Sequence, residues 1–177
     1  MKLPHQNKMR EIKIEKITLN IGVGGPGDKL DKAMKLLQKI TGNKPIQTKT
    51  TKRIPTWGIR PNLPIACKVT IRGKKAEELL IKLLDAVNQN INVRKFDKNG
   101  NFSFGINEYI NIQGIEYEID IGIIGLEAAV TLTRPGYRIK RRLIKNKISK
   151  KHQITKEEGI NFVKSYFNVK TEEGGEE

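Results

Sequence analysis

Apolar and polar residues alternate along five segments of the chain, and this pattern predicts β-strands. Residues 12–21 are predicted to form a strand with Ile17, Leu19 and Ile21 on its apolar face, and residues 65–72 alternate most regularly, so each segment has one apolar and one polar face. Shorter segments at 44–49, 102–106 and 126–134 follow the same pattern. The sequence therefore predicts a sheet that buries one face and leaves the other open.

Other segments carry apolar residues at helical spacing. Asp28 is expected to be the N-cap of a helix that ends at Gly42, and residues 74–90 form a second amphipathic helix. The pair Thr155 and Glu158 is a capping box that begins a third, short helix. Single apolar stripes and single apolar strand faces predict an α+β fold with two layers, in which helices pack on one face of a mostly antiparallel sheet.

The length of 177 residues suits one domain. We expect a flexible N-terminal arm at 1–11, a single α+β domain at 12–170 and a disordered acidic tail at 171–177; no pattern assigns residues 108–125. The single cysteine, Cys67, lies in an alternating segment and is expected in the core. One cysteine and two distant histidines predict no disulfide, no zinc site and no cofactor. Without an apolar run of membrane-spanning length or a signal peptide, we expect a cytoplasmic protein and no membrane partner.

Charge is distributed in zones. Twelve Lys or Arg residues and no acid lie between Asp31 and Glu77, and ten basic residues and no acid lie from Ala128 to Lys156. Biased composition alone would explain many lysines. It would not explain why acids are absent from these two segments but present in the stretch between them, from Glu77 to Glu127. The zones, with a net charge of +15, predict a polyanionic partner whose counterions are released on binding.

The open sheet face is polar and cationic. In the short strand, Ile46 and Thr48 are expected on one side and Gln47 and Lys49 on the other. The predicted open face consists of Lys16, Thr18, Asn20, Gln47, Lys49, Lys68, Thr70 and Arg72. No aromatic residue is among them to stack on unpaired bases, so this face suits structured RNA contacted through phosphates and sugars. The alternative is an ordinary solvated sheet face.

The glycine-rich turn Gly22–Gly27 has the spacing of a dinucleotide-binding motif. The acid that should follow about twenty residues later is missing, however, because that region is acid-free. We therefore prefer a different role for the glycines, in which they let backbone amides or a closely approaching chain reach a phosphate. No Ser-His-Asp, Walker or HExxH pattern appears, and we predict that the chain is not an enzyme.

A long basic loop joins two predicted strands at 50–64 and contains three prolines and the only tryptophan. Loops of this length are usually functional, and a cationic one could reach a second phosphate-rich molecule. Trp57 would then either stack on a base or hold the loop against its own domain. The loop candidates are Lys49, Lys52, Arg53, Trp57 and Arg60.

Four ordered motifs resemble the large-subunit ribosomal protein L-five family, which binds 5S rRNA. They are KITLNIGVG at 16–24, ITGNKP at 40–45, PIACKVTIRG at 64–73 and GNFSFGINE at 100–108. RPGYR at 134–138 resembles the archaeal and eukaryotic branch. The similarity covers roughly residues 10 to 170.

The resemblance implies a structural protein that attaches 5S rRNA in the central protuberance of the ribosome. Its implied partners are 5S rRNA, large-subunit rRNA, P-site tRNA at the basic loop, other central-protuberance proteins and a small-subunit head protein of the S-thirteen family across an intersubunit bridge. Asn20, Asn43 and Thr70 match family positions that contact 5S rRNA. Together with the polar face, the predicted 5S rRNA contacts are Lys16, Thr18, Asn20, Asn43, Gln47, Thr48, Lys68, Thr70 and Arg72. Other rRNA contacts are predicted at Arg138, Lys140, Arg141 and Arg142. The alternative function is a free-standing RNA chaperone or regulator.

Overall fold

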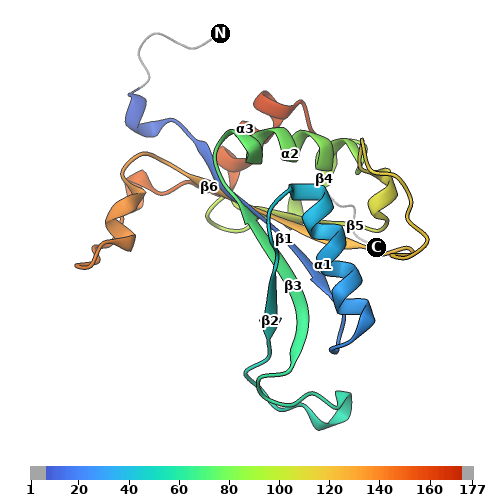
Figure 1. Cartoon of the computed structure of the whole chain (residues 1–177). Helices are drawn as coiled ribbons and strands as arrows, with labels where there is room; N and C mark the ends of the chain where they lie inside the picture. The colour runs from blue at the N-terminus through green and yellow to red at the C-terminus, as the bar shows by residue number, and fades with distance from the viewer. Residues whose placement is uncertain (1–6, 173–177) are drawn as a thin grey trace.

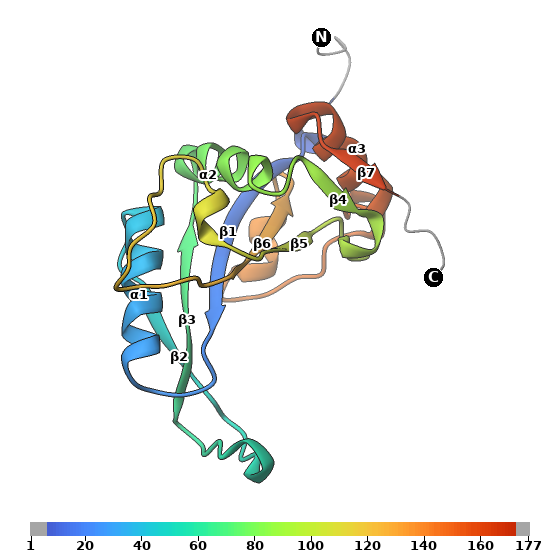
Figure 2. The ribbon, with the colours of Figure 1, turned by 90° about the vertical axis from the view of Figure 1, so that its right-hand side faces the viewer.

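The computed structural model describes residues 7–172, which contain a five-stranded sheet with the strand order β2-β3-β1-β6-β5 (Figures 1 and 2). Every pairing in this sheet is antiparallel. The strands are β1 (Lys13–Gly22), β2 (Ile46–Lys49), β3 (Pro64–Ile71), β5 (Phe102–Ile106) and β6 (Leu126–Thr133). The longest strands, β1, β3 and β6, lie at the centre of the sheet.

Three helices complete the fold: α1 (Asp28–Thr41), α2 (Lys74–Asp85) and α3 (Lys156–Phe167). Figures 1 and 2 together show α1 and α2 on the same side of the sheet. Their apolar stripes pack with the apolar strand faces into one core cluster, in which Leu19, Leu36 and Leu80 are fully buried. The predicted two-layer α+β fold is confirmed.

Two predicted helix ends are wrong. Gly27, not Asp28, is the N-cap of α1; its φ of 124° suits glycine, and Asp28 is the first helical residue. There its charge still faces the positive end of the helix dipole. α2 ends at Asp85 rather than near residue 90, because Asn88 and Gln89 have positive φ angles that no α-helix contains. The capping box at Thr155 is confirmed.

A second, two-stranded sheet pairs β4 (Asn90–Asn92) in parallel with β7 (Lys170–Glu172). The predicted disordered tail is therefore wrong for residues 171 and 172, which belong to β7. The alternation of polar and apolar residues is too short in both segments to predict this pairing. The remaining tail residues, 173–177, lie outside the described part of the chain.

The described part of the predicted N-terminal arm contacts the domain. Lys8–Arg10 form a 3-10 turn, and the backbone carbonyl of Arg10 accepts a hydrogen bond of 3.1 Å from Nε of Arg134. Residues 1–6 of the arm lie outside the described residues.

Candidate nucleic-acid interface

The face of the sheet opposite α1 and α2 presents polar side chains in rows across its three central strands. In one row, Thr18 on β1 lies opposite Thr70 on β3; in the next, Asn20 lies opposite Lys68. On the other side of β1, Asn20 lies opposite Glu127 of β6. Directly opposite residues have their Cβ atoms about 5 Å apart. The rows therefore form a continuous polar surface, which we call the open face.

The predicted residues of β1 and β3 share this surface. Lys68, Thr70 and Arg72 are exposed, whereas Lys16, Thr18 and Asn20 are partly buried. The predicted absence of aromatic residues is confirmed for the open face of all five strands, because Phe102 and Phe104 of β5 point into the core. The open face offers ammonium, guanidinium, hydroxyl and amide groups, and no stacking platform for unpaired bases.

Strand β2 corrects the prediction for Gln47. Gln47 pairs with the buried Cys67, and its Nε2 lies 3.4 Å from Sδ of Met34 on α1, so it lies on the helix side of the sheet. Ile46 lies on the open side instead and is 65% exposed. β2 is a short edge strand, and its pairing with β3 overrides the preference of one isoleucine for the core.

The other two predicted contact residues of β2, Thr48 and Lys49, do not occupy the positions that simple alternation predicts. Thr48 lies across from Ala66 on the open side, but its Oγ1 is buried and has no hydrogen-bond partner in the structure. Lys49 is exposed and lies across from Pro64, after a register shift that separates it from Thr48. Asn43 is exposed in the turn after α1, where its backbone N–H donates to Oγ1 of Thr41 at 3.2 Å.

Two carboxylates share the open face with these cations. Glu15 lies at a bulge in β1, where Oε1 accepts a hydrogen bond of 3.2 Å from Nη1 of Arg72 and Oε2 forms an ion pair with Arg141. Glu127 accepts a hydrogen bond of 3.3 Å from Nδ2 of Asn20. The alternation in 126–134 could have predicted Glu127 on this face. The bulge that places Glu15 coincides with a break in the alternation at two consecutive polar residues, Glu15 and Lys16, and this break is the signal that could have found it.

The basic segment, residues 135–153, folds back over one end of the open face. In Figure 1 it is the orange chain on the left of the sheet, and Figure 2 places it behind the sheet, on the side away from α1. Its 3-10 turn at Tyr137–Arg141 carries Arg138, Lys140 and Arg141, and Arg142 follows; all four cations are exposed. A cleft of about 950 Å³ lies between this segment and strands β1 and β6.

Arg134 anchors the basic segment. Its side chain is 5% exposed and donates to the carbonyl of Gln153 at 3.2 Å and to Oε1 of Glu158 at 2.8 Å. Burial raises the pKa of Glu158, but hydrogen bonds from Thr155 and Arg134 outweigh it and hold the pKa below its ordinary value. The sequence places Arg134 in the RPGYR motif and among the basic residues of 128–156, but no pattern predicts that it is the one buried cation among the described residues.

The basic loop forms the tip of the β2–β3 hairpin and projects away from the rest of the molecule (Figure 1). Backbone hydrogen bonds of 3.0 Å join Ile54 and Ile59 in both directions. Lys52, Arg53 and Arg60 are exposed, and the ring of Trp57 is 72% exposed. This exposure contradicts the alternative in which Trp57 holds the loop against its own domain.

Two backbone amides of the glycine-rich turn are already used within the sheet. The backbone N–H groups of Val23 and Gly24 both donate to the carbonyl of Ile65 at 2.9 Å, so the turn ties β1 to β3. The antiparallel sheet also differs from the parallel sheet of a dinucleotide-binding fold.

Within residues 7–172, no group of three or more His, Cys, Asp or Glu side chains could hold a metal ion. No helix in this range is long and apolar enough to cross a membrane. Cys67 is fully buried, as predicted for a core residue, and burial raises the pKa of its thiol to about 11.

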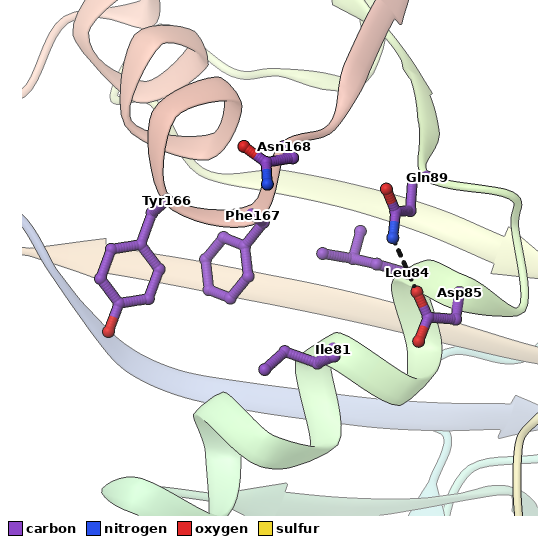
Figure 3. A pocket seen from close by; sticks show the side chains of 7 residues that line it. All are labelled: Ile81, Leu84, Asp85, Gln89, Tyr166, Phe167 and Asn168. Carbon is purple, nitrogen blue, oxygen red and sulfur yellow. Dashed lines mark hydrogen bonds between the residues drawn. The ribbon is translucent and has the colours of Figure 1, made fainter.

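A smaller hollow lies between the C-terminal ends of α2 and α3 (Figure 3). Its volume is about 180 Å³, and Ile81, Leu84, Tyr166 and Phe167 supply most of its lining. The one charged residue in the lining of this hollow is Asp85, whose Oδ1 accepts a hydrogen bond of 2.9 Å from Nε2 of Gln89. This hollow lacks the cations of the open face and is not part of the nucleic-acid interface.

Known proteins match this chain over nearly its whole length. A family model described as ribosomal protein L5 matches residues 7–60, and a second model, described as the C-terminus of the same ribosomal family, matches residues 64–162. The large ribosomal subunit protein uL5 of Nanoarchaeum equitans is 52% identical over 93% of this chain and 98% of its own length. The uL5 proteins of Sulfurisphaera tokodaii and Methanosphaera stadtmanae are 49% and 45% identical, over 95% and 94% of this chain and 96% and 99% of their own lengths. The chain therefore belongs to the ribosomal protein L5 family of the large ribosomal subunit.

Proposed function

We propose that the chain binds 5S rRNA through the open face and helps to attach it in the central protuberance. As a member of its family, the protein is a constituent of the large ribosomal subunit, and its relatives are structural proteins of the ribosome, which is cytoplasmic in archaea. The observation that carries the proposal is the pair of rows formed by Thr18 with Thr70 and Asn20 with Lys68. These rows offer donors to phosphates and 2′-hydroxyls without an aromatic platform, which suits the minor groove of paired RNA.

The hairpin tip is proposed to contact P-site tRNA. Lys52, Arg53 and Arg60 are exposed there with Trp57, at a distance from the open face (Figure 1). The tip can therefore reach a second RNA while the sheet holds the first, and each cation that meets a phosphate adds to the salt dependence of binding.

The acidic segment 108–127 is proposed to contact the small-subunit head protein of the S-thirteen family. Acids such as Glu108 and Glu116 make this surface unsuited to RNA phosphates. Ile119 and Ile123 are 86% and 66% exposed there, which is typical of a surface that another protein covers.

The experiment that tests the 5S assignment crosslinks the protein in cells and sequences the bound RNA. A double variant, Lys68→Ala with Thr70→Ala, is compared with Lys29→Ala with Lys35→Ala on α1, which removes two exposed cations from the other side of the sheet. We expect 5S rRNA with the wild type and the α1 variant and a strong loss with the sheet variant. Recovery of unrelated RNAs would support the free-standing chaperone instead, and equal recovery from both variants would exclude the open face.

A further inference from the structure

We propose that the cleft beneath the basic segment holds an unpaired nucleotide, with its phosphate, from the RNA that docks on the open face. This inference rests on the proposed function, because it assigns one part of that RNA to a separate site. The open face suits paired RNA, whereas the cleft carries more lysines and is covered on one side by the basic segment.

Cations dominate the lining of the cleft. They are Lys16, Lys140, Arg141, Lys145, Lys147 and Lys150. Among the lining residues the one carboxylate is Glu15, and both of its oxygens already contact arginines, Arg72 and Arg141. The remaining lysines have no acid within the cleft to neutralise them. An anion that enters therefore replaces their counterions.

The dimensions select an unpaired nucleotide over a double helix. A volume of about 950 Å³ lies at the upper end of the range of small-molecule sites, roughly 300 to 1,000 Å³. The basic segment forms a wall over β1 and β6, so paired RNA on the sheet meets this wall, while a base that has left the duplex can pass beneath it. Asn99 and Asn146 line the cleft and add amide groups, which can donate to and accept from a base edge.

The wall is fixed at both ends before any ligand arrives. At its start, the hydroxyl of Tyr137 donates to the carbonyl of His152 at 3.2 Å and accepts from the N–H of Ile154 at 2.9 Å. The ring nitrogen Nε2 of His152 lies 2.9 Å from the carbonyl oxygen of Pro135, which closes the segment into a loop. A preformed cleft does not have to order its own chain when RNA binds, which favours affinity.

The test uses the full-length protein with 5S rRNA and a thiol-directed photocrosslinker. Asn146→Cys places the probe in the cleft and Thr70→Cys places it on the open face, while the native Cys67 is fully buried and does not react. We expect the cleft probe to crosslink to an unpaired nucleotide and the sheet probe to crosslink to a paired region of the same RNA. Lys145→Ala with Lys147→Ala removes the cations proposed to contact the one phosphate of this nucleotide, so it should lower the salt slope of binding by about 0.7, the value for one single-strand phosphate contact.

Four outcomes are decisive. Crosslinks from position 146 only to paired nucleotides, or no crosslinks there while position 70 still labels the RNA, overturn the cleft assignment and leave the proposed function standing. An unchanged salt slope in the lysine variant also overturns it. Absence of crosslinks from both positions overturns the proposed function itself.

Discussion

Replacement of Gly159 by alanine tests how tightly α3 is seated on the domain. Gly159 lies in the first turns of α3, and a Cβ atom there would stand 2.7 Å from both Cα and the carbonyl oxygen of Gly100. Gly100 has a φ of 75° and belongs to the turn before β5. Both contacts are with backbone atoms, which cannot rotate away as a side chain can. The alanine must therefore push α3 off this turn.

The expected effect is the difference between two terms. Alanine is favoured over glycine within a helix by about 1 kcal/mol. Overpacking of a close contact costs about 1–3 kcal/mol, and the upper value applies here because backbone meets backbone. The net loss in the free energy of unfolding is about 2 kcal/mol. For a chain of this size each 1 kcal/mol lowers Tm by about 2–4 °C, so Tm should fall by about 4–8 °C.

Thermal unfolding followed by circular dichroism measures this change. Gly25→Ala is the matched control, because a Cβ atom at Gly25 meets no atom within 4 Å and its φ is not positive. The control should remain within about 0.5 kcal/mol of the wild type. If Gly159→Ala had the same Tm as the wild type or a higher one, the close backbone contact between α3 and the turn at Gly100 would be refuted.

Two further predictions concern titratable groups. The pKa of Glu158 is lowered in the folded chain, so its stabilisation is present above the ordinary pKa of 4.5 and is lost as the pH falls through the lowered value. Glu158→Gln should unfold with a weaker pH dependence below pH 4.5 and lose about 1 kcal/mol or less at pH 7, since its side chain is 42% exposed; an unchanged acid unfolding curve contradicts this. The buried thiol of Cys67, with a pKa raised to about 11, should resist iodoacetamide at pH 8 in the native protein and react once the chain is unfolded in urea; equal rates in both states would contradict its burial.

The sequence was sufficient for the elements with long, regular patterns. The alternation from Lys16 to Ile21 in β1 and along β3 determines which side chains are buried, so the open-face positions of Asn20 and Thr70 could be predicted. The helix stripes and the capping box at Thr155 are equally local signals. Each of these patterns predicts which residues are buried from the segment's own sequence, and the identity of the neighbouring strands is not needed.

Features that depend on distant partners could not be predicted in this way. Gln47 and Ile46 are placed by the pairing of a four-residue edge strand with β3, and their own polarity points to the opposite arrangement. Arg134 is enclosed because carbonyls from residues 10, 152 and 153 converge on it, which no local pattern encodes. The cleft depends on the same convergence, so the sequence predicted the cations of the basic segment but not that they face the sheet.

The position of β1 at the centre of the sheet has a consequence for synthesis of the chain. β1 is made first, yet Asn20 meets Glu127 across 107 residues of sequence, and Arg10 meets Arg134 across 124. Such distant pairings form slowly, because the closure of long loops costs entropy before the contacts are made. A nascent chain that stops before β6 is an incompletely folded polycation without the finished open face. Only a chain made at least through β6, which ends at Thr133, can present that face to RNA, which couples selective RNA recognition to the synthesis of this strand.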